Sequence, residues 1–232
     1  MDLEKLPSFL SLISLLLISV FAYFEAKKEN RGNRRLSPSS IAKAGVFGAL
    51  SALLYVVPIF TIKLPFFPEF LTLHFDEVPA LLIGLSEGSL CAFLVLLAKT
   101  FIKLPFTSTA TVGEWADLIL SCLLILPVCL LYRKKKSKKA MLLGFAISLP
   151  MHLVLAMVLN VYVLIPFFSV LYGLPLDALL AICQAAIPAI QDVGWSYAFF
   201  AVLPFNALKD AIVIVLSCSF YGGLRYFLER NR

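Results

Sequence analysis

Asn206, Lys209 and Asp210 interrupt an apolar run near the end of the chain that continues to Cys218. At membrane depth an ionisable group costs roughly a few kcal/mol or more, so it usually faces a cavity or a partner rather than lipid. An amide can donate and accept hydrogen bonds, and an ammonium group donates them. These side chains are therefore candidates for binding a polar solute inside the membrane.

Further polar side chains are expected at the same depth. A rise of about 1.5 Å per helical residue places a set of them near the outer ends of their helices, whereas the inner halves are nearly free of charge. We therefore expect a chamber that opens outward and captures a solute from outside. The set comprises Asn160, Asn206, Lys209, Lys99, Glu114 and Asp117.

A purely structural interpretation of the same residues stays open. Lys209 could pair with Asp117 or Asp210 and tie helices together, and Glu114 could cap a helix N-terminus, where a carboxylate is favoured. We interpret Asp210 as a charge that balances Lys209 rather than as a ligand contact.

The stretch 60–68 mixes aromatic residues and prolines with one cation. Prolines limit the entropy that is lost on closing, and aromatic rings offer a flat apolar surface to a flat ligand. We expect a lid in which Thr61, Leu64, Phe66 and Phe67 meet the ligand. The alternative is an aromatic belt at the membrane interface.

The sequence lacks the motifs that would indicate ATP binding or a metal enzyme. It carries no GxxxxGK[ST] motif for ATP and no HExxH motif for a metal. His74 and His152 lie on different segments, and the five cysteines are scattered singly, so we expect no metal site, no cofactor and no catalytic residues. An enzyme is disfavoured.

The composition predicts an all-α polytopic membrane protein. The chain has 232 residues, of which 61% are hydrophobic and 15% charged, and its mean hydropathy is +0.94. Predicted spans are 7–26, 40–58, 70–86, 88–104, 113–132, 140–166 and 197–224. This makes a six-helix core over 37–232, preceded over 1–36 by an extra N-terminal transmembrane helix and a basic linker.

The net charge of +6 lies in short basic blocks at 27–35, 133–139 and 225–232, a pattern of membrane topology rather than of nucleic-acid binding. The positive-inside rule places these blocks in the cytoplasm and the N-terminus outside a cell membrane. The segments 59–69, 105–112 and 167–196 are then external, and the last is expected to hold a short interfacial helix over 176–190.

Small residues repeat along the first core helix. Ala44, Gly48 and Ala52 recur every four residues, with Gly45 and Ala49 in a parallel row. Such a face lets another helix approach closely, and that helix could belong to a partner or to the same chain.

Together several stretches resemble the riboflavin-specific substrate-binding (S) components of energy-coupling-factor (ECF) transporters. They are residues 63–71, 75–82, 97–99, 113–117, 160–166 and 204–209. The sequence departs from the family pattern at His74, Asp76 and Glu77, and at Asp117, where the family usually has Asn.

The resemblance implies a six-helix core that binds riboflavin from outside and works with a transmembrane coupling protein and two cytoplasmic ABC ATPases, tilting in the bilayer to release its cargo. It implies flavin contacts from Asn160, Asn206 and Lys209, a lid over 61–67, and contact of Ala44, Gly48 and Ala52 with the coupling protein. Flavin mononucleotide is left open as a second ligand. The alternatives are an S component for another vitamin, a stand-alone ion-coupled carrier and a membrane-embedded enzyme.

Overall fold

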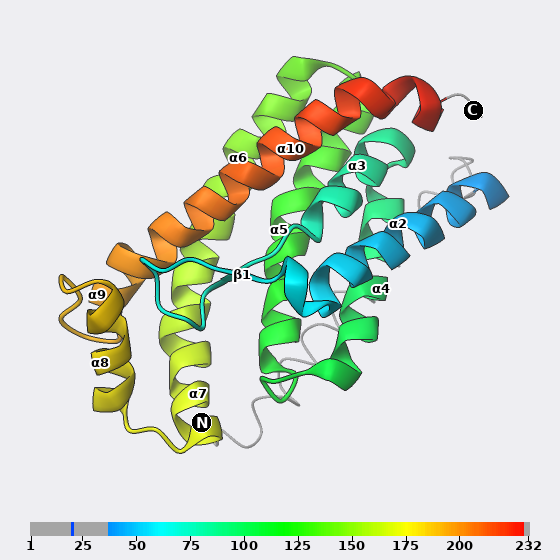
Figure 1. Cartoon of the computed structure of the whole chain (residues 1–232). Coiled ribbons are helices and arrows are strands. Elements are labelled where there is room, and N and C mark those ends of the chain that lie inside the picture. The colour runs from blue at the N-terminus through cyan, green and yellow to red at the C-terminus, as the bar shows by residue number, and fades with distance from the viewer. Residues whose placement is uncertain (1–19, 21–36, 230–232) are drawn as a thin grey trace.

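The computed structural model describes residue 20 and residues 37–229, with only the backbone for 224–229. Apart from residue 20, the predicted helix over 7–26 lies outside the described residues, and so does its basic linker. Nine α-helices follow in the described part: α2 (Pro38–Val56), α3 (Glu77–Glu87), α4 (Ser89–Lys103), α5 (Val112–Lys135), α6 (Lys138–Leu159), α7 (Ile165–Tyr172), α8 (Leu176–Ala186), α9 (Trp195–Tyr197) and α10 (Leu203–Glu229) (Figure 1).

Two π-helical turns make longer helices continuous. The turn η4 (Asn160–Leu164) joins α6 to α7, and η5 (Ala198–Val202) joins α9 to α10. Short 3-10 turns follow α2 (η2, Pro58–Phe60) and α4 (η3, Leu104–Phe106). Within the described residues, five segments are long and apolar enough to cross a membrane: Pro38–Val56, Ser89–Phe106, Val112–Lys135, Lys138–Tyr172 and Trp195–Gly223.

Helix α3 completes the core of six. It has 11 residues, and residues 77–86 are all buried, which confirms the predicted all-α polytopic fold. The expected span over 70–86 was wrong at its start, because its apolar beginning is extended. The strand β2 (Thr72–Leu73) pairs antiparallel with β1 (Ile62–Lys63), with Ile62 opposite Leu73 and Lys63 opposite Thr72.

Local sequence sets several helix boundaries. Ser37 accepts a hydrogen bond from the backbone N–H of Ser40 at 3.0 Å, and Pro38 occupies the first turn of α2, where proline is tolerated. Gly88, at φ 110°, allows the chain to turn between α3 and α4, and Gly173, at φ 63°, ends α7.

The helices pack closely, and different elements lie at the two ends of the molecule. Helices α5 and α6 pack so closely that a Cβ on Gly144 would lie 2.6 Å from Val128 Cα. At one end lie α7, α8 and α9, and at the opposite end lie the turn between α5 and α6 and the last turns of α10 (Figure 1). The segment that carries β1 and β2 joins α2 to α3. The short helix expected over 176–190 is present as α8.

Candidate functional site

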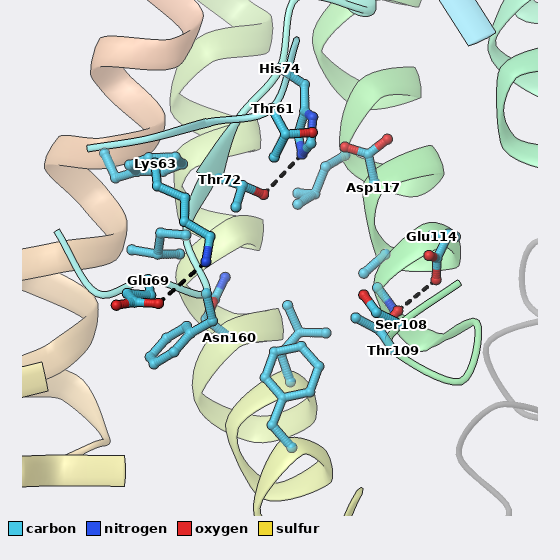
Figure 2. A pocket seen from close by; sticks show the side chains of 18 of the residues that line it. Thr61, Lys63, Glu69, Thr72, His74, Ser108, Thr109, Glu114, Asp117 and Asn160 are labelled. Carbon is cyan, nitrogen blue, oxygen red and sulfur yellow. Dashed lines mark hydrogen bonds and ion pairs between the residues drawn. The ribbon is translucent and has the colours of Figure 1, made fainter. Parts of the chain in front are cut away.

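A cavity of about 800 Å³ lies between the β1–β2 segment and helices α5, α6 and α10. Its volume is in the range of small-molecule sites. Asn160, Asn206, Lys209, Asp117 and Thr61, all predicted site residues, line it. Aromatic side chains provide apolar wall, and several of the polar residues are seen in Figure 2. The aromatic set is Tyr55, Phe70, Phe168, Tyr172 and Phe205.

Both asparagines of the cavity sit at π-helical turns. Asn160 opens η4, and its Nδ2 donates to Ala156 O at 2.9 Å. Asn206 follows η5, and its Nδ2 donates to Val202 O, the last residue of that turn, at 2.8 Å. Such turns are rare and occur often at functional sites. Each amide nitrogen is thus bound to a backbone carbonyl four residues earlier in the chain.

Beneath the cavity lies a buried ionic ring formed by Asp76, Glu77, Lys99, Asp117 and Lys209. Lys99 Nζ contacts an Asp76 carboxylate oxygen and lies 2.8 Å from Asp117 Oδ2. Lys209 Nζ lies 2.6 Å from Glu77 Oε1 and 3.7 Å from Asp117 Oδ1. Buried charges are usually paired, because an unpaired one is costly.

Ser121 joins the two halves of the ionic ring. Its hydroxyl accepts from Lys99 Nζ at 3.2 Å and donates to Glu77 Oε1 at 3.2 Å. Lys99 has no exposed side-chain surface and does not line the cavity, so it supports the site from below. Asp117 and Lys209 reach both the ring and the cavity, and therefore the structural and the ligand-binding interpretations of these two residues are compatible.

Asp76 and Glu77 are the partners that sequence reasoning did not include in the site. Both are almost fully buried. Two adjacent carboxylates in the apolar stretch 70–86 could have indicated a role in the site, but the same pair is equally typical of the start of a helix. Asp210 also differs from the expectation. It lies 2.8 Å from His152 Nδ1 on α6 rather than against Lys209.

Glu114 holds the loop before α5. Its Oε2 accepts hydrogen bonds from the hydroxyls of Thr107 at 2.8 Å and Thr109 at 2.6 Å, the second of which is drawn in Figure 2. Glu114 also lines the cavity and is almost fully buried. Glu114 stands in the first turn of α5, where a carboxylate is favoured, but its recorded hydrogen bonds go to the two threonine hydroxyls rather than to backbone N–H groups of the helix.

Three of the four predicted lid residues line one of two cavities. Thr61 lines the main one, whereas Leu64 and Phe67 line a second cavity of about 770 Å³ against α8. Phe67 also packs on Phe205, with ring centroids 5.3 Å apart. Phe66 is 56% exposed and lines neither cavity. An ion pair of 3.2 Å between Lys63 and Glu69 closes the base of this segment (Figure 2).

His74 connects the lid segment to the site. Its Nε2 lies 2.9 Å from Thr72 Oγ1, and its ring stands edge-on to Tyr55 at 5.3 Å. Burial, and after it the charge of Lys209, lowers the pKa of His74 from 6.5 to about 4. The imidazole is therefore neutral at physiological pH.

The small residues of α2 face the interior. Ala44, Gly48 and Ala52 are buried, and a Cβ on Gly48 would lie 3.3 Å from Ala98 on α4. Gly45 and Ala49 of the parallel row are exposed. Among the described residues, no group of three or more His, Cys, Asp or Glu side chains could hold a metal ion.

Comparisons with known proteins give a consistent picture. The family model described as "ECF transporter, substrate-specific component" matches residues 39–221. The chain is 26% identical to the riboflavin transporter RibU of Staphylococcus aureus (strain TCH60), over 86% of this chain and 98% of the relative. It is 24% identical to the riboflavin transporter FmnP of Bacillus subtilis (strain 168), over 83% and 96%.

The fold also matches a solved structure, described under "Structure and mechanism of the S component of a bacterial ECF transporter". The TM-score is 0.62 at 24% identity, and the match covers 82% of this chain and 98% of that one. It agrees with the six-helix core described above.

Proposed function

The chain belongs to the family of substrate-specific components of ECF transporters, and we propose that it captures riboflavin from outside the cell. It is a multi-pass membrane transport component rather than an enzyme. A flavin would be its cargo and not a cofactor. The observation that carries the proposal is the meeting of Asn160, Asn206 and Lys209 in one cavity beneath the lid segment. Both curated relatives bear the name riboflavin transporter.

The chemistry of the cavity suits a flavin. The ring system is flat, and its pyrimidine edge carries an imide N–H between two carbonyl oxygens. Aromatic walls offer apolar surface to the ring faces, and a few placed polar groups set its orientation. Lys209 and the Asn160 amide supply donors for the carbonyls, and Asn206 Oδ1 supplies an acceptor for the imide.

The distribution of charge supports capture from outside. The last turn of α5 carries Arg133, Lys134 and Lys135, and Lys138 and Lys139 follow after the connection to α6. The positive-inside rule assigns this end to the cytoplasm. Helix α8, whose Leu179 and Ile182 line the cavity, lies toward the other end (Figure 1), so in this orientation the cavity would open to the exterior.

Release into the cell would require the coupling protein and two ABC ATPases of the ECF assembly. Because Ala44, Gly48 and Ala52 are buried within the chain, the coupling protein would meet the exposed side of the same helix. Gly45 and Ala49 lie there, and a Cβ on Gly45 has open space within 4 Å. A close helix crossing is favoured at such positions.

Riboflavin titration of the purified protein tests the proposal. We expect riboflavin fluorescence to be quenched on binding to the wild type. Asn206→Ala and Lys209→Ala should each weaken binding, because each leaves a partner unpaired at a cost of about 1 to 3 kcal/mol. Flavin mononucleotide should be titrated in parallel to settle the second ligand.

Ser217→Ala is the matched control. Ser217 is a fully buried polar residue of the same helix α10, outside the cavity lining, and its removal should leave riboflavin affinity unchanged. Wild-type riboflavin affinity in both Asn206→Ala and Lys209→Ala would contradict the assignment of these residues to the binding site. A protein that ignores riboflavin and binds another vitamin would contradict the ligand, and transport in liposomes without ATPases would favour a stand-alone carrier.

A further inference from the structure

Tyr197 is fully buried next to the cavity without lining it. It belongs to α9, immediately before the π turn η5. Its hydroxyl donates to Asn160 Oδ1 at 3.2 Å. Its ring centroid lies 5.9 Å from that of Phe70, a cavity-lining residue between β1 and β2. A buried tyrosine hydroxyl usually has a hydrogen-bond partner, and here that partner is a predicted ligand-binding amide.

The two asparagines differ in how fully their amides are held. Asn160 Nδ2 donates to Ala156 O while its Oδ1 accepts from Tyr197. Both ends of this amide are therefore engaged, and exchanging its oxygen and nitrogen would break both hydrogen bonds. Asn206 Nδ2 donates to Val202 O, but no described residue donates to its Oδ1. The hydrogen bond from Tyr197 accounts for this difference between the two asparagines.

Hydrogen-bond capacity then fixes what Asn160 can offer a ligand. An amide nitrogen has two N–H groups, and the bond to Ala156 uses one of them. The other remains for the cavity. Because Tyr197 occupies one side of Oδ1, Asn160 presents a donor in a set orientation, which suits a carbonyl oxygen of the ligand.

We propose that Tyr197 is a positioning residue that locks the Asn160 amide as a hydrogen-bond donor and so sets the cavity's preference for a ligand with a carbonyl at that place. The inference rests on the proposed flavin-binding function and deepens it. Tyr197 acts only through Asn160, so its contribution to binding must vanish when the Asn160 amide is absent. That dependence separates positioning from a general role in folding.

A double-mutant cycle measures this dependence. Riboflavin dissociation constants are compared for wild type, Tyr197→Phe, Asn160→Ala and the double variant. Tyr197→Phe keeps the ring and loses one hydrogen bond, so we expect binding weakened about 3- to 10-fold. The double variant should bind as Asn160→Ala does, because contacting residues couple non-additively.

Tyr132→Phe is the matched control. Its hydroxyl lies 3.3 Å from that of Tyr221 in the buried core, outside the cavity lining. It should lower the unfolding temperature about as much as Tyr197→Phe without changing riboflavin affinity. Equal losses from Tyr197→Phe with and without Asn160, or no loss at all, would overturn the proposal while leaving riboflavin binding intact. A wild type that binds no riboflavin would defeat the proposed function, and this inference with it.

Discussion

Lys99 is a buried cation that does not line the cavity. It is completely buried between Asp76 and Asp117. Removing one partner of a buried ion pair leaves the other charge uncompensated, which costs about 3 to 5 kcal/mol. We therefore expect Lys99→Met to be strongly destabilised in denaturant or thermal unfolding in detergent. Lys63→Met, which breaks the exposed pair with Glu69, should cost at most about 1 kcal/mol.

A second variant keeps this prediction testable if Lys99→Met does not fold. Asp76→Asn in the Lys99→Met background removes the carboxylate left without its partner, so part of the lost stability should return. Equal stability of Lys99→Met and the wild type would contradict the role given to the ionic ring.

The lowered pKa of His74, about 4, predicts a pH dependence of stability. In the unfolded chain the imidazole titrates near 6.5. Between these values the unfolded state binds a proton that the folded state does not, so stability falls as the pH drops from about 6.5 towards 4. Above about 6.5 this group contributes no change.

His74→Gln supplies the comparison for unfolding temperatures measured from pH 7.5 to 4.5. The variant cannot titrate at this position, so its curve should be flatter than that of the wild type through this range. Parallel curves would show that the acid sensitivity arises from the carboxylates alone.

The residue types of the site were predictable, whereas several of their contacts were not. Depth along each helix was enough to predict that Asn160, Asn206 and Lys209 line one cavity, because polar groups in apolar helices usually face a cavity or a partner rather than lipid. The pairing of Asp210 with His152 depends on how α6 and α10 are rotated about their axes. A single sequence does not specify that rotation.

At the scale of elements, α3 depends on the close approach of its neighbours. A Cβ on Gly84 would lie 2.3 Å from Cys129 Sγ on α5 and 2.8 Å from Ala92 Cβ on α4. Gly84→Ala should therefore overpack the core and cost about 1 to 3 kcal/mol in unfolding free energy. Gly45→Ala, with nothing within 4 Å of its new Cβ, should be neutral or stabilising by roughly 0.5 to 1 kcal/mol. The reverse order of stability would contradict this packing.

Long elements were predicted well and the short ones less so. The spans at 88–104 and 113–132 correspond closely to α4 and α5, since their apolar runs and charged ends leave little choice. The start of α3 was misplaced because apolar residues such as Leu71 and Leu73 suit a buried strand as well as a membrane helix. The pairing of β2 with β1 decides between these possibilities. It joins two strands separated by the eight residues 64–71, and periodicity does not reveal such a contact.

Over the whole molecule, α2 has one buried face and one exposed face. Its buried face packs on α4 through Gly48, and its exposed face carries Gly45 and Ala49. Assembly with a coupling protein through the exposed face predicts that Gly45→Leu leaves folding and riboflavin affinity unchanged. It should reduce co-purification with the coupling protein and ATPases, because a bulky side chain prevents close helix crossing.

Two glycine variants complete that experiment. Gly222→Leu places the same side chain on α10, again with nothing within 4 Å of the new Cβ, and assembly should persist. Gly48→Leu should instead lower stability, since its Cβ would already lie 3.3 Å from Ala98. If Gly45→Leu assembled normally, the partner would have to bind another face, and the exposed row of α2 would be no more than a lipid-facing surface. The buried face of α2 would then serve the fold alone, and coupling would have to arise from another helix of the core.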